Sequence, residues 1–133
     1  MSSPMILLAD DEAHITCVVA QKLRSAGFAV ATARDGEEAF ELACRVKPSL
    51  IITDLQMPRL SGLELALRLK QTPATAQTPL LMLTARGYIL EQDSLARTNI
   101  RQVLTKPFSS REVLRLAVEL VGSPMAAPHS EAA

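Results

Sequence analysis

The sequence predicts an α/β protein built on a five-stranded parallel sheet with helices on both faces. Short apolar runs alternate along the chain with longer segments in which apolar residues recur every three or four positions. Five such pairs follow one another, and strands joined through helices pair in parallel by right-handed crossovers. The length of 133 residues matches one ordinary domain with a single substantial core.

Five short apolar runs are the expected strands. The run "LIIT" at 50–53 is the clearest, because β-branched and apolar residues without alternation favour a strand covered on both faces. It ends at Asp54. The expected strands are 5–9, 29–33, 50–53, 80–84 and 102–105.

The segments between these runs carry helical signals. A capping residue followed three positions later by Glu marks a helix start, because the two residues can satisfy each other's backbone N–H groups. Glu12 is expected in the first turn of the first helix, where a negative charge favours the helix dipole. The segment 87–98 has a modest apolar face and predicts the poorest helix. Helix starts are expected at Asp35, at Ser61, and at Ser109 or Ser110.

The composition argues against several classes of function. Fourteen basic and fourteen acidic residues cancel, which disfavours a dominant nucleic-acid surface or an electrostatic membrane anchor. No stretch reads as a membrane span or a signal peptide. Cys17 and Cys44 lie far apart in expected helices and form neither a metal motif nor a disulfide framework. We therefore expect a cytoplasmic domain at 5–121, with an N-terminal extension at 1–4 and a disordered tail or the start of a linker at 122–133.

Polar residues stand where the expected strands end. Asp10 and Asp11 follow the first strand, Asp54 ends the third, Thr84 ends the fourth and Lys106 follows the fifth. Taken singly, each has an ordinary explanation as a helix cap, a turn residue, a strand residue or a solvated charge. Because the carboxyl ends of parallel strands meet at one edge of the sheet, we expect the five side chains to converge on one site.

The chemistry of this set favours a phosphoryl site. Neighbouring carboxylates repel one another unless a cation lies between them, and Mg²⁺ prefers one or two carboxylates together with phosphate oxygens. Asp11 and Asp54 are the expected direct ligands, and Asp10 would act directly or through water. Lys106 and Thr84 would contact a phosphoryl oxygen, and Asp54 is placed to be the nucleophile.

Four motifs carry a family resemblance. "ADDE", "IITDLQMPRLSGLEL", "LMLTA" and "VLTKPF" resemble the motifs of response-regulator receiver domains from two-component signalling. The resemblance spans 5–121 and includes the spacing between the acidic pair, Asp54, Thr84 and Lys106. It implies the flavodoxin-like (βα)5 doubly wound sheet in the order 2-1-3-4-5, as a single-domain, stand-alone receiver.

The resemblance also implies a role for each residue. Asp54 would accept a phosphoryl group from a phosphohistidine on a sensor histidine kinase or a histidine phosphotransfer protein. Lys106 would hold the phosphoryl oxygens, and Thr84 would begin a switch of the surface formed by the fourth helix, fifth strand and fifth helix. That surface would bind a downstream protein or a second copy of the chain, without direct contact to nucleic acid or membrane. The implied Mg²⁺ ligands are Asp10, Asp11, Asp54 and the backbone carbonyl of Gln56.

Some positions depart from the family pattern. The aromatic residue that usually lies three positions before the lysine is Val103, which cannot swing a ring between exposed and buried positions, and Tyr88 is a candidate substitute. The Gly-Ala that usually precedes the fifth strand reads Asn99-Ile100. Gln56 and Arg86 occupy the variable positions that flank the phosphoryl group, so they would tune the lifetime of the aspartyl-phosphate.

Two other functions remain as alternatives to a signalling phosphoacceptor. A haloacid-dehalogenase-like Mg²⁺ phosphatase also uses an aspartyl nucleophile, but it carries a second Asp two residues later, where this chain has Gln56. A pseudo-receiver that only binds proteins is disfavoured by the complete acidic, hydroxyl and lysine set. Val103 keeps this second alternative open for the signalling step.

Overall fold

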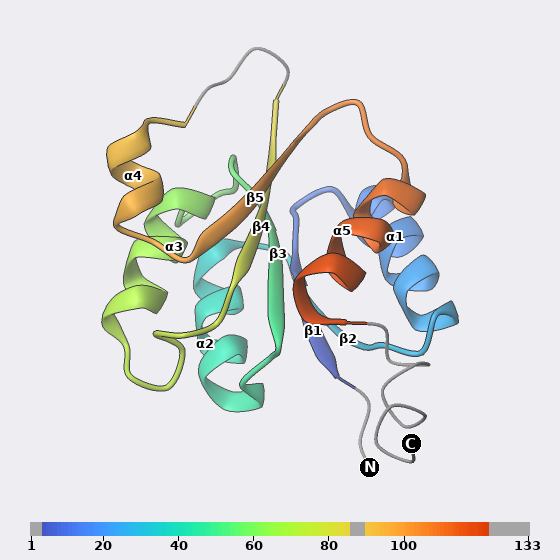
Figure 1. The fold of residues 1–133 in the computed structure, drawn as a ribbon, viewed down its shortest axis with the longest axis horizontal. Helices are drawn as coiled ribbons and strands as arrows, with labels where there is room; N and C mark the ends of the chain where they lie inside the picture. The colour runs from blue at the N-terminus through green and yellow to red at the C-terminus, as the bar shows by residue number, and fades with distance from the viewer. Residues whose placement is uncertain (1–3, 86–89, 123–133) are drawn as a thin grey trace.

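The computed structural model describes residues 4–85 and 90–122 (Figure 1). Within these ranges five strands alternate with five helices, as the sequence predicts. The strands are β1 (Met5–Ala9), β2 (Ala29–Ala33), β3 (Leu50–Asp54), β4 (Leu80–Thr84) and β5 (Ile100–Thr105). The helices are α1 (Ala13–Ser25), α2 (Gly36–Val46), α3 (Gly62–Gln71), α4 (Gln92–Ala96) and α5 (Ser110–Val121).

The strands form one parallel sheet in the order β2-β1-β3-β4-β5. Figure 1 shows α1 and α5 on one face of this sheet and α2, α3 and α4 on the other. Helices therefore cover both faces, which explains why the inner strands are continuous apolar runs. The predicted flavodoxin-like (βα)5 sheet with the order 2-1-3-4-5 is confirmed.

The side chains of β1 show how the sheet divides the core into two layers. Leu7 and Ala9 pack in the layer that contains α2 and α3, whereas Ile6 and Leu8 pack in the layer that contains α1 and α5. All four are fully buried. Burial of a Leu or Ile side chain stabilises a fold by about 1.5 to 3 kcal/mol. The two layers together hold the strand ends in fixed relative positions.

The start of β5 differs from expectation. β5 begins at Ile100, two residues before the expected position 102. The buried Asn99 side chain explains this difference, because its carbonyl accepts a hydrogen bond from Lys70 Nζ at 3.0 Å and its amide donates to the carbonyl of Ala76. These bonds hold the chain beside the end of α3 and align Ile100 with the first residue of β4.

The helix starts follow the capping signals. The Asp35 carboxylate accepts the N–H of Glu38 at 2.9 Å, and Ser61 forms a reciprocal capping box with Glu64 at the start of α3. Ser109, rather than Ser110, caps α5 through a second capping box. The sequence therefore located these three starts correctly.

The prediction for Glu12 is wrong. Glu12 is the N-cap residue of α1, with an extended backbone, and the first turn of the helix begins at Ala13. The Asp10 carboxylate accepts the N–H of Glu12 at 2.9 Å, which holds this residue in a turn ahead of the helix. The Glu12 side chain makes no capping hydrogen bond, so it is free to face the end of the sheet.

The fourth helix is shorter than predicted. α4 spans five residues, none of them fully buried, and only Leu95 among them packs against the core, which gives the helix little tertiary stabilisation. Thr98 lies beyond its end and donates a hydrogen bond to the carbonyl of Ser94 at 3.0 Å. Residues 87–89 of the predicted helix lie outside the described residues. In the part of the chain that the structure describes, no helix has the length and apolar character needed to cross a membrane.

Candidate functional site

The carboxyl ends of three strands bring the predicted polar residues to one edge of the sheet. Asp10 follows β1, Asp54 ends β3 and Thr84 ends β4, and all three are buried. Lys106 follows β5, and its backbone N–H donates to the carbonyl of Thr84 at 2.8 Å. The fold therefore brings these four residues to one edge of the sheet, and Asp11 lies in the turn that follows β1.

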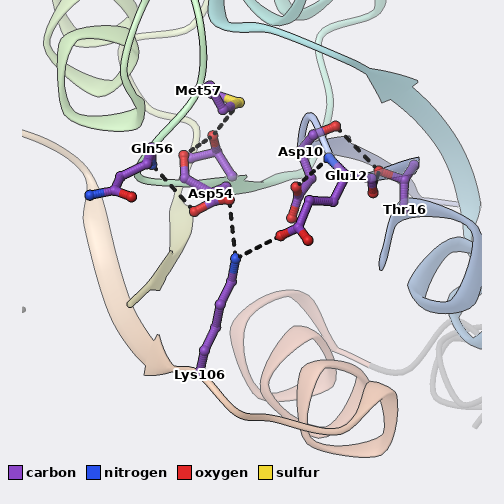
Figure 2. Close-up of polar contacts among 8 residues, drawn as sticks. Asp10, Glu12, Thr16, Asp54, Gln56, Met57 and Lys106 are labelled. Carbon is purple, nitrogen blue, oxygen red and sulfur yellow. Dashed lines mark hydrogen bonds and ion pairs between the residues drawn. The ribbon is translucent and has the colours of Figure 1, made fainter. Parts of the chain in front are cut away.

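Lys106 reaches across this edge to two carboxylates (Figure 2). Its Nζ lies 3.2 Å from Asp54 Oδ2 and 3.3 Å from Glu12 Oε1. Partial burial lowers the pKa of Lys106, but attraction to Asp54 and hydrogen bonds to Asp54 and Glu12 outweigh that effect, so the pKa is raised overall. The side chain is a permanently charged donor at neutral pH.

Asp54 is buried but opens onto a cleft. Its side chain is 7% exposed, and its Oδ1 accepts the backbone N–H of Gln56 at 3.3 Å (Figure 2). The cleft has a volume of about 690 Å³, and its polar lining includes Asp11, Glu12, Asp54 and Lys106. The buried aspartate is thus reachable by a ligand that approaches over the loop after β3.

Asp10 is a buried carboxyl group that hydrogen bonds satisfy only in part. It is 1% exposed, and the peptide N–H of Glu12 donates to Oδ1, while Oδ2 has no hydrogen-bond partner among the described residues. Burial raises the pKa of Asp10 from 3.8 to about 6; the Glu12 N–H opposes this rise and the charge of Asp54 adds to it. A buried carboxylate oxygen without a partner is costly unless a cation or water binds it.

The acidic cluster differs in one member from the predicted set. Carboxylate oxygens of Asp10, Glu12 and Asp54 all lie within 4.8 Å of one another, whereas Asp11 is exposed and lines the cleft without joining this group. Sequence reasoning missed Glu12, because it placed this residue in the helix. The signal that pointed to it was the third acid of "ADDE", directly after the predicted ligands.

The residues at this edge fit a divalent cation. The Lys106 ammonium contacts two of the three clustered carboxylates, so the site carries uncompensated negative charge when all three are ionised. Every donor is an oxygen, and the unpartnered Oδ2 of Asp10 needs a partner. Hard cations such as Mg²⁺ prefer such oxygens. Asp10 and Asp54 could hold the ion, with Asp11 or Glu12 contributing from the cleft wall.

Thr84 is the predicted switch residue, and Val103 occupies the position where the family usually has an aromatic partner for it. The Thr84 hydroxyl is fully buried and has no hydrogen-bond partner among the described residues. Val103 is 37% exposed on β5, where it pairs with Met82 of β4. Arg86 and Tyr88 lie outside the described residues.

One glycine that the sequence analysis did not identify packs closely against the backbone of Asp54. Gly62, the first residue of α3, donates its N–H to the carbonyl of Leu55 at 2.7 Å. A Cβ atom at this position would overlap the backbone carbonyl of Asp54 and approach Leu55 Cα. Only glycine lets α3 begin this close to the end of β3. Its place next to the capping residue Ser61 was the available signal.

Comparison with known proteins assigns the family. Residues 6–119 match the model of the response regulator receiver domain. The chain belongs to the response-regulator receiver family. The predicted resemblance is therefore confirmed, and this receiver is a domain of two-component signalling. Receiver domains act with histidine kinases or phosphotransfer proteins and bind Mg²⁺ at an acidic site.

Individual relatives agree with this assignment. The receiver is 39% identical over 127 residues to the alkaline phosphatase synthesis transcriptional regulatory protein PhoP of Bacillus subtilis, covering 95% of this chain and 52% of that regulator. The chain thus spans about half the length of the curated relatives it matches.

Solved structures show the same architecture. The chemotaxis response regulator CheY4 of Vibrio cholerae has a TM-score of 0.81 and 28% identity, covering 90% of this chain and 99% of that one. The receiver domain of sensor histidine kinase PA1611 from Pseudomonas aeruginosa has a TM-score of 0.80 and 26% identity, covering 92% of this chain and 100% of that one. That structure holds a magnesium ion in its active-site cleft.

Proposed function

We propose that this receiver accepts a phosphoryl group on Asp54 from a phosphohistidine partner in a Mg²⁺-dependent reaction. The observation that carries the proposal is the ion pair between Lys106 and the buried Asp54 at the mouth of the cleft. The pair would offer an incoming phosphoryl group a nucleophilic oxygen and a positive charge next to it. The donor would be a sensor histidine kinase or a histidine phosphotransfer protein.

The transfer would use Asp54 as the nucleophile. A carboxylate oxygen of Asp54 attacks the phosphorus, a new O–P bond forms, the N–P bond of the phosphohistidine breaks, and the histidine leaves with a proton from solvent. Such reactions depend on positioning and on neutralisation of the oxygens of the transferred group. Gln56 N–H orients one oxygen of Asp54 and Lys106 supplies charge at the other.

Bound Mg²⁺ would supply the remaining positive charge beside the phosphoryl oxygens. The expected ligands are Asp10, Asp11, Asp54 and the backbone carbonyl of Gln56. Asp10 contributes the unpartnered oxygen that most needs a cation, and Asp11 lines the cleft. All of these ligands donate oxygen atoms, which Mg²⁺ prefers, and this supports the assignment.

The phosphorylated site would act on a distant surface through Thr84. Its buried hydroxyl lacks a partner in the present arrangement, so it is available to donate to a phosphoryl oxygen. A dianionic group biases a two-state element when it creates new hydrogen bonds. We infer that β5 and its flanking helices α4 and α5 respond and bind a downstream protein or a second copy of the chain.

The observations favour this function over its two rivals. A phosphatase of the haloacid-dehalogenase type needs an acidic residue two positions after the nucleophile, whereas Gln56 is an amide with an exposed side chain. A receiver that only binds proteins has no use for a buried, incompletely paired carboxylate beside Asp54. We therefore infer a cytoplasmic signalling phosphoacceptor rather than an enzyme.

Acetyl phosphate tests the proposal without a partner kinase. Intact-mass measurement should show one added phosphoryl group in the presence of Mg²⁺ and none after chelation. Asp54→Asn should abolish the addition, whereas the control Asp93→Asn, which alters an exposed aspartate on α4, should retain it. Addition that persists in Asp54→Asn would exclude this residue as the acceptor.

A further inference from the structure

We propose that Glu12 is a positioning residue that holds Lys106 before phosphorylation and competes with the phosphoryl group for its ammonium. This inference rests on the proposed function of Asp54. It concerns a residue that the sequence does not predict to bind the metal or the phosphoryl group. The consequence is that the resting receiver carries its own anion at the place where the phosphoryl charge would arrive.

The backbone of Glu12 is fixed from both sides. Its N–H donates to Asp10 Oδ1 at 2.9 Å, and its carbonyl accepts from the backbone N–H of Thr16 at 3.1 Å and from the Thr16 hydroxyl at 3.2 Å (Figure 2). The side chain takes no part in capping α1. The carboxylate is therefore directed by a rigid backbone and is 57% exposed at the cleft.

Lys106 is shared between two anions. Its Nζ lies 3.2 Å from Asp54 and 3.3 Å from Glu12, at nearly equal distances (Figure 2). An ammonium has three N–H donors, and two of them face these carboxylates. A phosphoryl group on Asp54 would bring further negative charge to the same ammonium and would compete with Glu12 for it, which should weaken the bond to Glu12.

Glu12 also opposes the phosphoryl group directly. Its carboxylate belongs to the cluster whose oxygens lie within 4.8 Å of one another, together with Asp10 and Asp54. A dianion on Asp54 would be repelled by this charge. The same charge attracts a divalent cation. Glu12 should therefore weaken binding of the phosphoryl group while it strengthens binding of Mg²⁺ alone.

Glu12 is thus expected to weaken binding of a phosphoryl mimic and to strengthen binding of Mg²⁺, and measuring both affinities tests the proposal. Mg²⁺ affinity is measured first by titration calorimetry, and binding of beryllium trifluoride, a phosphoryl mimic, is then measured by ¹⁹F NMR at saturating Mg²⁺. Glu12→Gln should tighten the trifluoride about threefold, the size expected when one partly exposed ion pair is removed. It should weaken Mg²⁺ binding. Glu12→Asp, which keeps the charge but retracts it from Lys106, should also tighten the trifluoride, by less.

Glu119→Gln is the matched control. Glu119 is 56% exposed and pairs with Arg115 on α5, so its loss removes a similar ion pair away from the site. It should change neither affinity. Unchanged or weaker trifluoride binding in Glu12→Gln would overturn the role of Glu12, including the case in which Glu12 is simply a metal ligand. Failure of the wild-type chain to bind the trifluoride would instead overturn the proposed function of Asp54.

Discussion

Lys106 Nζ lies 3.2 Å from Asp54 Oδ2 and so joins the ends of β3 and β5, two strands separated in the sheet by β4. The Asp54 side chain is 7% exposed and that of Lys106 is 28% exposed. The pair is therefore partly shielded from water, and its strength should exceed that of a surface ion pair. Because Lys106 follows β5, the charge next to the Asp54 carboxylate depends on the position of that strand.

Removal of the ammonium should destabilise the resting receiver. Lys106→Met leaves Asp54 buried without its cation, and we expect the free energy of unfolding to fall by about 1 to 2 kcal/mol, between the values for exposed and buried pairs. Urea unfolding without Mg²⁺ measures this. In an Asp54→Asn background the same substitution should cost less. Equal costs in both backgrounds would mean that the pair has no net coupling.

The stability of the receiver without metal should depend on the ionisation of Asp10. Its pKa is raised from 3.8 to about 6, so the folded state holds this proton more tightly than the unfolded chain does. The contribution of Asp10 to the free energy of unfolding should therefore fall as the pH rises from about 4 to about 6, by about 3 kcal/mol in total.

Asp10→Asn isolates this effect from the other titrating groups. Unfolding of the variant and the wild-type chain is compared in a chelator across that pH range. The variant should gain stability relative to the wild-type chain as the pH rises. A difference that stays constant with pH would show that Asp10 does not carry the raised pKa.

Asp11 and Glu12 should contribute unequally to Mg²⁺ binding. We expect Asp11→Asn to weaken Mg²⁺ binding by about tenfold or more, because loss of a ligand should cost at least as much as loss of a group that only orients one. Glu12→Gln should weaken it by less, because Glu12 is engaged with Lys106. Calorimetry on both variants decides between the two neighbours. A larger loss in Glu12→Gln would transfer the ligand role to that residue.

The response to phosphorylation should depend on Thr84 more than on Val103. The Thr84 hydroxyl is buried without a partner, whereas Val103 is 37% exposed and has no polar group. Val103→Ala should retain most of the backbone amide shift changes seen on phosphorylation, and Thr84→Ala should lose most of them. Two-dimensional NMR of both variants measures this, and equal losses would refute a hydroxyl-based switch.

The sequence predicted those features of the fold that depend on residues close to one another in the chain. Apolar runs located the strands, the capping residues Asp35, Ser61 and Ser109 located helix starts, and the topology then brought Asp10, Asp54, Thr84 and Lys106 to one edge. This convergence follows from parallel pairing alone.

Features that depend on one tertiary contact were not predictable. Glu12 lies outside the helix because the Asp10 carboxylate binds its N–H, and β5 begins early because the Asn99 side chain is held by Lys70 and the Ala76 carbonyl. Nothing in the order of the residues indicates which of two adjacent acids faces Lys106. That choice is made by the turn between β1 and α1.

Chemical trapping of the phosphorylated residue tests the central claim most directly. The receiver is phosphorylated with acetyl phosphate and Mg²⁺, reduced with borohydride, which converts an aspartyl-phosphate to homoserine, and digested for peptide mass spectrometry. We predict homoserine at position 54 and unmodified Asp10 and Asp11. Homoserine at another aspartate, or an acid-stable phosphoryl group on a hydroxyl residue, would contradict the assignment of Asp54.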